Sequence, residues 1–200
     1  MVTSRKAAAD GPRERIVGGA RRHFFAHGFR GVTMDELARE LGMSKKTLYV
    51  SFPGKRDLLH AVIDDKAAAI DADLERITSD RDAPFEERLA RLLECFRTHA
   101  GEIQPSFVRD VRREAPELFE RIERLRADVL ERHFGKLLER GRRDGLVRKD
   151  IPVKLLIEVL LGVMSSVVNP QKVEELGTTP KVAMLSVLAV FLEGALVRKK

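Results

Sequence analysis

The chain has 200 residues, of which 44% are hydrophobic, and this is enough for one sizeable core or two small ones. Aromatic residues make up only 6% of the chain and Trp is absent, a composition typical of packed amphipathic helices rather than of sandwiches or barrels. Strict alternation of apolar and polar residues is nearly absent, which argues against a large sheet. We therefore expect an all-α fold.

The cysteine content and the hydropathy pattern exclude further classes of protein. The single cysteine, Cys95, has no partner for an internal disulfide, which fits a reducing compartment. The first 15 residues lack the apolar centre of a secretory signal, and the most apolar stretch, Val153 to Val168, contains Lys154 and Glu158. We expect a cytoplasmic protein that does not associate with a membrane.

The net charge of +6 is distributed unevenly along the chain. Residues 1–56 contain 12 Lys and Arg against 5 Asp and Glu, whereas residues 57–200 contain 25 against 26. The positive excess therefore lies entirely in the first quarter of the chain. Such a concentration of basic residues is expected of a local nucleic-acid-binding surface.

Apolar residues recur at helical spacing from residue 12 onward, and glycine, proline and capping residues separate the helical segments. Residues 1–11 are small, polar and basic, and we expect them to form a flexible tail. The predicted helices, about nine in number, cover approximately residues 12–27, 34–41, 45–52, 55–78, 84–100, 105–114, 116–143, 153–169 and 180–199.

Two of these helices are short and meet at a glycine-bearing turn. Thr33 is placed as the N-cap of the first, with Glu36 completing a capping box, and Ser44 is placed as the N-cap of the second, directly after Gly42 and Met43. Short helices joined in this way are the requirement of a helix-turn-helix. Leu48 and Phe52 are predicted to point inward on the second helix, which leaves five residues on its outer face: Lys45, Lys46, Thr47, Tyr49 and Val50.

The segment GVTMDELARELGMSKKTLY at residues 31–49, followed by FPGKRDLL at residues 52–59, resembles the TetR family of bacterial DNA-binding transcriptional regulators. The resemblance covers about residues 12–63. It implies a helix-turn-helix domain at residues 12–54, a connecting helix at 55–78, and a ligand-binding and dimerisation domain at 79–200.

The resemblance also implies roles for individual residues in binding DNA. Thr33, Thr47, Tyr49 and Lys55 are expected to contact backbone phosphates, with Ser44 at the start of the recognition helix, while Lys45, Lys46 and Val50 are expected to lie closest to base edges. Lys46 and the pair Val50-Ser51 depart from the residues common in the family, so the operator sequence is not readable. The alternatives are that the two lysines form only a solvated face, that Tyr49 simply packs its ring on the domain, and that Lys55 is an ordinary exposed lysine.

The two carboxyl-terminal helical segments are apolar on nearly every face, over Val153–Val168 and Val182–Leu196. One small core cannot bury both, so we predict a homodimer formed by these helices. Resemblance to the TetR family implies the same arrangement. A dimer places two recognition helices in successive major grooves about 34 Å apart, so the predicted DNA partner is an inverted-repeat operator.

A small-molecule effector is predicted to bind in the middle of the carboxyl-terminal domain. The candidate ligand-binding residues are Phe96, His99, Phe107, Val111, Phe119 and His133. Ordinary core packing of the aromatic residues, and satisfied or exposed histidines, are the competing interpretations. Cys95 and His99 share one helix face, which suggests a reactive thiol or, alternatively, a small buried hydrophobe.

Catalytic motifs are missing from the sequence. It contains no HExxH, no Gly-rich phosphate loop, and no nucleophile with an adjacent base, so we expect neither an enzyme, nor a cofactor, nor a metal site. The predicted function is a DNA-binding transcriptional regulator, a repressor released by a small molecule. An all-helical interaction module, or a regulator that needs no ligand, is the alternative.

Overall fold

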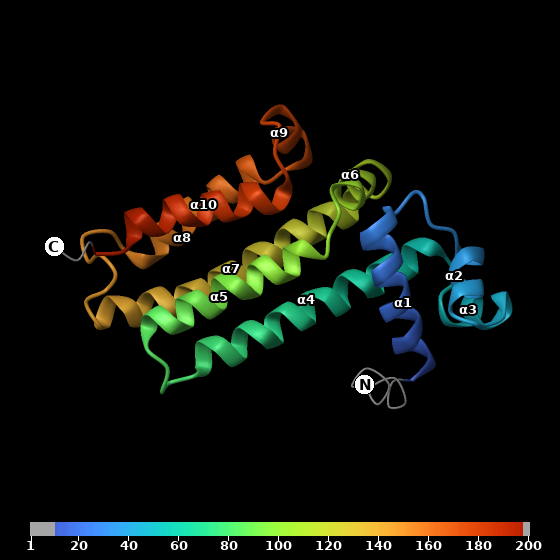
Figure 1. The fold of residues 1–200 in the computed structure, drawn as a ribbon, viewed down its shortest axis with the longest axis horizontal. Coiled ribbons are helices and arrows are strands. Elements are labelled where there is room, and N and C mark those ends of the chain that lie inside the picture. Colours follow the sequence, from blue (N-terminus) through green and yellow to red (C-terminus); the bar gives the residue numbers. More distant parts are fainter. Residues whose placement is uncertain (1–10, 198–200) are drawn as a thin grey trace. The chain divides into compact units, whose positions relative to one another are not determined.

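The computed structural model describes residues 11–197, and every regular element among them is a helix (Figure 1). The basic tail expected at residues 1–11 lies outside the described residues except for Gly11. The expected all-α class is confirmed, with ten helices in the described part of the chain where about nine were predicted. The helices are α1 (Pro12–His27), α2 (Met34–Glu40), α3 (Lys45–Ser51), α4 (Lys55–Ser79), α5 (Phe85–Gly101), α6 (Pro105–Glu114), α7 (Pro116–Arg143), α8 (Val153–Val167), α9 (Pro170–Glu175) and α10 (Pro180–Ala195).

The chain folds into two compact units that do not follow chain order. The head unit comprises residues 1–68 and 102–119, and the bundle unit comprises residues 69–101 and 120–200. Helices α4 and α7 therefore begin in the head unit and end in the bundle unit. The expectation that one domain ends at residue 54 and the next begins at residue 79 stays a prediction.

Helix α1 supplies the centre of the head unit. Ile16, Ala20 and Phe24 on one face of the helix are fully buried, and the Phe24 ring packs edge-on against Phe29 with 5.5 Å between centroids. Gly19 lies so close to the side chain of Leu41, the C-cap of α2, that a Cβ atom at residue 19 would stand 2.3 Å from Leu41 Cδ2. A glycine at this position therefore lets α1 and α2 approach closely.

Helix α6 is part of the head unit although it follows α5 in sequence. The backbone N–H of Gln104 donates to the carbonyl of Phe25 at 3.0 Å, and the rings of Phe25 and Phe107 pack edge to face at 4.8 Å. The Asp110 carboxylate accepts from the backbone N–H of Arg30 at 3.0 Å. These contacts join α6 to the end of α1 and to the loop that leads into α2.

The bundle unit packs α5, α7, α8 and α10 around one apolar core. Phe134 on α7 is fully buried between two other rings, with its centroid 5.9 Å from Phe96 on α5 and 6.4 Å from Phe191 on α10. Helices α8 and α10 lie side by side in this unit (Figure 1). Their inner faces contribute Leu156, Ile157, Leu160, Met164, Val187, Leu188 and Leu192 to the core.

Two details of the bundle unit differ from the sequence expectation. Helix α9 was not predicted, although Asn169 caps it by accepting from the backbone N–H of Lys172 at 2.9 Å and Pro170 occupies its first turn. Helix α10 ends at Ala195 and not at Lys199, because the chain leaves the helix to pair with the segment after α7. There the backbone N–H of Val197 donates to the carbonyl of Leu146 at 2.9 Å, beside a bridge between Val147 and Leu196.

None of the helices in the described part of the chain is both long enough and apolar enough to span a membrane.

Candidate nucleic-acid interface

The turn between α2 and α3 is built from local capping interactions. Thr33 accepts from the backbone N–H of Glu36 at 3.2 Å, while the Glu36 carboxylate accepts from the backbone N–H of Thr33 at 2.8 Å, so the predicted capping box is present. These hydrogen bonds from Thr33 hold the pKa of Glu36 below its ordinary value. Ser44 caps α3 as predicted, accepting from the backbone N–H of Thr47 at 3.1 Å.

Gly42 allows the chain to reverse between these two helices. Its φ of 64° lies in the left-handed region that favours glycine. The next residue, Met43, donates its backbone N–H to the carbonyl of Ala38 at 3.0 Å and is only partly buried. The sequence pattern for a helix-turn-helix is therefore realised as two short helices, α2 and α3, joined by a tight glycine turn.

Buried apolar residues fix the inner face of α3 against the head unit. Leu48 and Phe52 are 0% and 1% exposed, as predicted from their spacing. The Arg13 guanidinium at the start of α1 lies over the Phe52 ring, 4.3 Å from its centroid, and donates to the carbonyl of Ser51 at 3.2 Å. Rotation of α3 about its axis is thereby opposed from both its inner side and its carboxyl end.

The outer face of α3 carries the residues that were expected to meet DNA. Lys45, Lys46 and Thr47 are exposed, and two apolar side chains accompany them: Tyr49 is 45% exposed and Val50 is 77% exposed. An exposed face that combines cations, a hydroxyl, a phenol and a branched apolar group offers both phosphate and base-edge contacts. The structure thus brings five of the eight predicted DNA-binding residues together on one helix.

The two lysines of this face differ in their surroundings. Lys45 Nζ forms an ion pair with Asp35 on α2 at 2.5 Å, a partner that sequence reasoning did not assign. Lys46 makes no ion pair with any residue that the structure describes. The charge of Lys45 is therefore partly balanced by Asp35 in the free protein, whereas that of Lys46 is not.

The remaining predicted DNA contacts, Thr33 and Lys55, make internal interactions in the free protein. The Thr33 hydroxyl donates to Glu36 at 2.8 Å. Lys55 Nζ lies 4.4 Å from the centroid of the Phe29 ring and 3.5 Å from the carbonyl oxygen of Arg30. Partial burial lowers the pKa of Lys55, against the opposing effect of Glu114 and Asp110.

An open hollow of about 720 Å³ lies in the head unit. It is formed by the loop after α1 and by α6, and its lining includes Arg30, Arg109 and Arg113 together with Asp110 and Glu114. Glu114 lies 3.7 Å from the Arg30 guanidinium, and Asp110 accepts a hydrogen bond from the backbone N–H of Arg30. The lining of this hollow therefore carries charges of both signs.

Comparison with known proteins identifies the segment that contains these helices. Residues 16–62 match the family model described as bacterial regulatory proteins, tetR family. This segment therefore resembles the DNA-binding segment of TetR-family regulators. It is 32% identical over 73 residues to the HTH-type transcriptional regulator SrpR of Pseudomonas putida, a match that covers 36% of this chain and 34% of that protein. It is 33% identical over 72 residues to the uncharacterized HTH-type transcriptional regulator TtgW, also of Pseudomonas putida, covering 35% and 54%.

The aligned segment therefore spans about a third of one curated relative and about half of the other.

Solved structures extend the likeness of fold over nearly the whole chain. SmeT, the repressor of the Stenotrophomonas maltophilia multidrug efflux pump SmeDEF, has a TM-score of 0.64 at 21% identity, covering 94% of this chain and 92% of that one. The ketosteroid transcriptional regulator KstR2 of Mycobacterium tuberculosis has a TM-score of 0.57 at 21% identity, covering 94% and 97%. At such identity these structures show the TetR fold alone.

The six predicted ligand-binding residues are divided between the two units. Phe107, Val111 and Phe119 belong to the head unit, and the first two are buried in it. Phe96 is buried in the bundle unit, where its ring stacks with Phe134. His99 lines a hollow in the bundle unit and contacts Asp73. The expectation that all six share one effector pocket stays a prediction.

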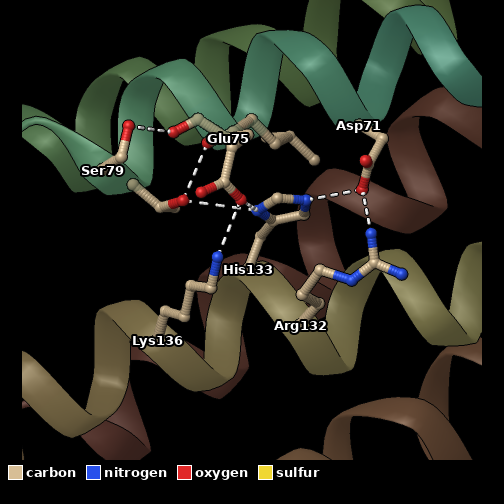
Figure 2. A network of polar contacts seen from close by, with 8 residues as sticks. Asp71, Glu75, Ser79, Arg132, His133 and Lys136 are labelled. Carbon is tan, nitrogen blue, oxygen red and sulfur yellow. Dashed lines mark hydrogen bonds and ion pairs between the residues drawn. The ribbon is translucent and has the colours of Figure 1, made fainter.

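His133, the sixth of these residues, is fully buried in a polar network between α4 and α7 (Figure 2). Its Nε2 lies 2.9 Å from Asp71 Oδ1, and its Nδ1 lies 3.3 Å from the Thr78 hydroxyl. The hydrogen bond from His133 holds the pKa of Asp71 below its ordinary value. Since both ring nitrogens have protein partners, His133 joins two helices and meets a ligand only if these bonds are broken.

Proposed function

We propose that the chain is a sequence-specific DNA-binding transcriptional regulator, a repressor that a small-molecule effector releases from an inverted-repeat operator. The observation that carries the proposal is the outer face of α3, where Lys45, Lys46, Thr47, Tyr49 and Val50 are exposed on a helix whose inner face is buried. The concentration of positive charge in residues 1–56 supports the same assignment.

Phosphate contacts are assigned to Thr33, Thr47, Tyr49 and Lys55, and base-edge contacts to Lys45, Lys46 and Val50, with Ser44 setting the start of α3. Contacts to phosphates position the protein on the duplex, whereas contacts to base edges select the sequence. Lys46, which has no ion pair within residues 11–197, is the residue best placed to reach a guanine edge. Val50 presents an apolar surface of the kind that contacts a thymine methyl group.

The homodimer is assigned to α8 and α10, which have exposed apolar residues opposite their buried ones. On α8, Leu155, Val159 and Val163 recur every four residues and are 52%, 51% and 40% exposed. On α10, Val182 and Val190 are 53% and 74% exposed. Exposed apolar stripes on two adjacent helices fit a symmetric four-helix interface with a second copy, and the two recognition helices would then meet one inverted repeat.

We assign the effector to the class of small organic molecules. This assignment is supported by the likeness of fold to a solved structure. The related structure of SmeT has been solved as a complex with triclosan. Release requires that the effector bind the DNA-incompetent state more tightly than the competent one.

The experiment that tests this function is selection of bound sequences from a random duplex pool at near-physiological salt, followed by mass determination of the complex. An enriched inverted repeat that binds a dimer, or a pair of dimers, supports the proposal. Binding without sequence enrichment, abolished by moderate salt, would favour an all-helical interaction module whose basic surface binds DNA only nonspecifically.

A further inference from the structure

Three potential metal ligands of different chemistry converge in the bundle unit. Asp73 lies on α4, and Cys95 and His99 lie one helical turn apart on α5. One donor atom from each of the three lies within 4.8 Å of the donor atoms of the other two. All three line an open hollow of about 520 Å³, so an ion from solvent has access to them.

The separations are close to those of a coordinated ion. In a tetrahedral zinc site, bonds of about 2.0–2.3 Å hold the ligand atoms roughly 3.3–3.8 Å apart. His99 Nε2 and Asp73 Oδ2 are already 3.1 Å apart. The Cys95 sulfur lies within 4.8 Å of a donor atom of each of the other two residues, in the lining of the same open hollow.

The charges around the three residues are compatible with a cation. Asp73 Oδ1 accepts from Arg76 at 2.9 Å, which leaves Oδ2 directed at His99. A hydrogen bond of this kind orients a ligating carboxylate from outside the coordination sphere. The other arginine of the hollow, Arg91, is paired with Asp80 at 2.8 Å.

We propose that Asp73, Cys95 and His99 form a binding site for one zinc-type divalent cation. A thiolate, an imidazole and a carboxylate are the ligand types that Zn²⁺ prefers, whereas Mg²⁺ and Ca²⁺ require mainly oxygen ligands. Three protein ligands leave the fourth position to water from the hollow. On binding, the Cys95 thiol loses its proton to solvent and no oxidation state changes. The site stands independently of the proposed DNA-binding function.

The sequence alone did not indicate this site, and no metal was expected from it. Cys95 and His99 are visible as a pair on one helix face, but the third ligand comes from α4, a different helix. Only the packing of α4 against α5 brings Asp73 to the pair.

The test uses the full chain purified without metal and titrated with Co²⁺, a spectroscopic substitute for Zn²⁺. Cys95 is the only cysteine, so a sulfur-to-cobalt charge-transfer band can arise only from its thiolate. We expect this band to saturate at one Co²⁺ per chain, with the visible spectrum of a tetrahedral ion, and to vanish when Zn²⁺ is added. Absence of the band at stoichiometric Co²⁺ would overturn the proposal.

Variants separate a three-ligand site from simple binding to a thiol. Cys95→Ser is expected to abolish the band, and His99→Gln and Asp73→Asn are each expected to weaken Zn²⁺ binding at least about tenfold in competition with a chromophoric chelator. His60→Gln, which removes an exposed imidazole from α4, is the matched control and should leave the affinity unchanged. Equal Zn²⁺ affinity in the wild type, His99→Gln and Asp73→Asn would contradict the site.

Thermal unfolding provides a second readout that does not depend on the absorption band of Co²⁺. Because Zn²⁺ binds only the folded arrangement of three ligands, it should raise the Tm of the wild type and leave that of Cys95→Ser unchanged. The apo wild type and all variants are compared by circular dichroism first, so that a misfolded variant is recognised. An unchanged Tm of the wild type at saturating Zn²⁺ would count against the proposal.

Discussion

Individual residues of the α3 face differ in what they offer to DNA. Lys45 is held by Asp35, Lys46 has no ion pair within the described part of the chain, and Tyr49 presents a half-exposed ring. A residue that contacts a phosphate affects every sequence alike, whereas one that contacts a base edge affects some sequences more than others. The two kinds of residue are therefore separable by mutation.

Tyr49 is proposed to contact a phosphate and Lys46 a base edge. We therefore expect Tyr49→Ala to weaken binding to all duplexes by a similar factor. Lys46→Ala is expected to change the preference among duplexes, by roughly 1–3 kcal/mol at the base pair concerned. The measurement is the affinity of each variant for a panel of operators with single base-pair changes. A uniform loss with Lys46→Ala would reassign Lys46 to a phosphate.

Lys55 combines a proposed DNA contact with an unfavourable position in the free protein. Partial burial is the main cause that lowers its pKa below the ordinary lysine value of 10.5. At pH values between the lowered pKa and 10.5, the unfolded chain therefore binds more protons than the folded one. The contribution of Lys55 to the free energy of unfolding should therefore rise with pH across this window. Lys55→Met should remove the rise, which is visible as the difference between wild-type and variant unfolding curves measured from pH 8 upward.

The same variant separates stability from binding. Lys55→Met is expected to bind all duplexes more weakly and to reduce the slope of log affinity against log salt by about 1, while the free energy of unfolding at neutral pH does not fall. A salt slope equal to that of the wild type would remove Lys55 from the set of phosphate contacts.

At the scale of elements, the position of the head helices depends on the close approach of α1 to α2. Gly18 and Gly19 are neighbours on α1, but only Gly19 faces Leu41; a Cβ atom at Gly18 would meet nothing nearer than an Arg22 nitrogen at 4.0 Å. Replacing glycine with alanine inside a helix raises the free energy of unfolding by about 0.5–1 kcal/mol when the added methyl group has space. Substitution by alanine should therefore stabilise the protein at residue 18 and destabilise it at residue 19.

Gly18→Ala is expected to raise the free energy of unfolding of the head by up to about 1 kcal/mol. Gly19→Ala is expected to lower it by about 1 kcal/mol, because overpacking against Leu41 exceeds the gain in helix propensity. Denaturant unfolding monitored by circular dichroism measures both. Stabilisation by both substitutions would show that Leu41 moves aside without cost.

Local signals predicted most of these elements. Thr33 with Glu36, and Ser44 with Thr47, cap their helices through residues three positions away, so the sequence alone shows them. The association of α6 with α1, the ion pair of Lys45 with Asp35, and the end of α10 at Ala195 depend on partners distant in sequence. Periodicity within one helix carries no information about such partners, which is why the α3 face was predictable and the grouping of Asp73 with Cys95 and His99 was not.

At the scale of the whole molecule, the exposed apolar stripes of α8 and α10 predict a dimer. Val159→Glu places a charge in the middle of the α8 stripe, where burial against a second copy would be costly. We expect this variant to be a monomer in sedimentation or light scattering and to lose affinity for an inverted repeat. Ala72→Glu, on the exposed side of α4, is the matched control and should remain a dimer. A dimeric Val159→Glu would place the interface elsewhere.

The most direct test of the proposed function compares affinity for the selected inverted repeat with affinity for an unrelated duplex at near-physiological salt. For the wild type we predict a ratio of at least about 10³. For a variant with Lys45→Ala, Lys46→Ala and Tyr49→Ala together, the ratio should fall close to one while the chain stays folded by circular dichroism, because none of the three side chains is buried in the core. A folded triple variant that keeps the wild-type ratio would contradict the assignment of the α3 face as the surface that recognises DNA.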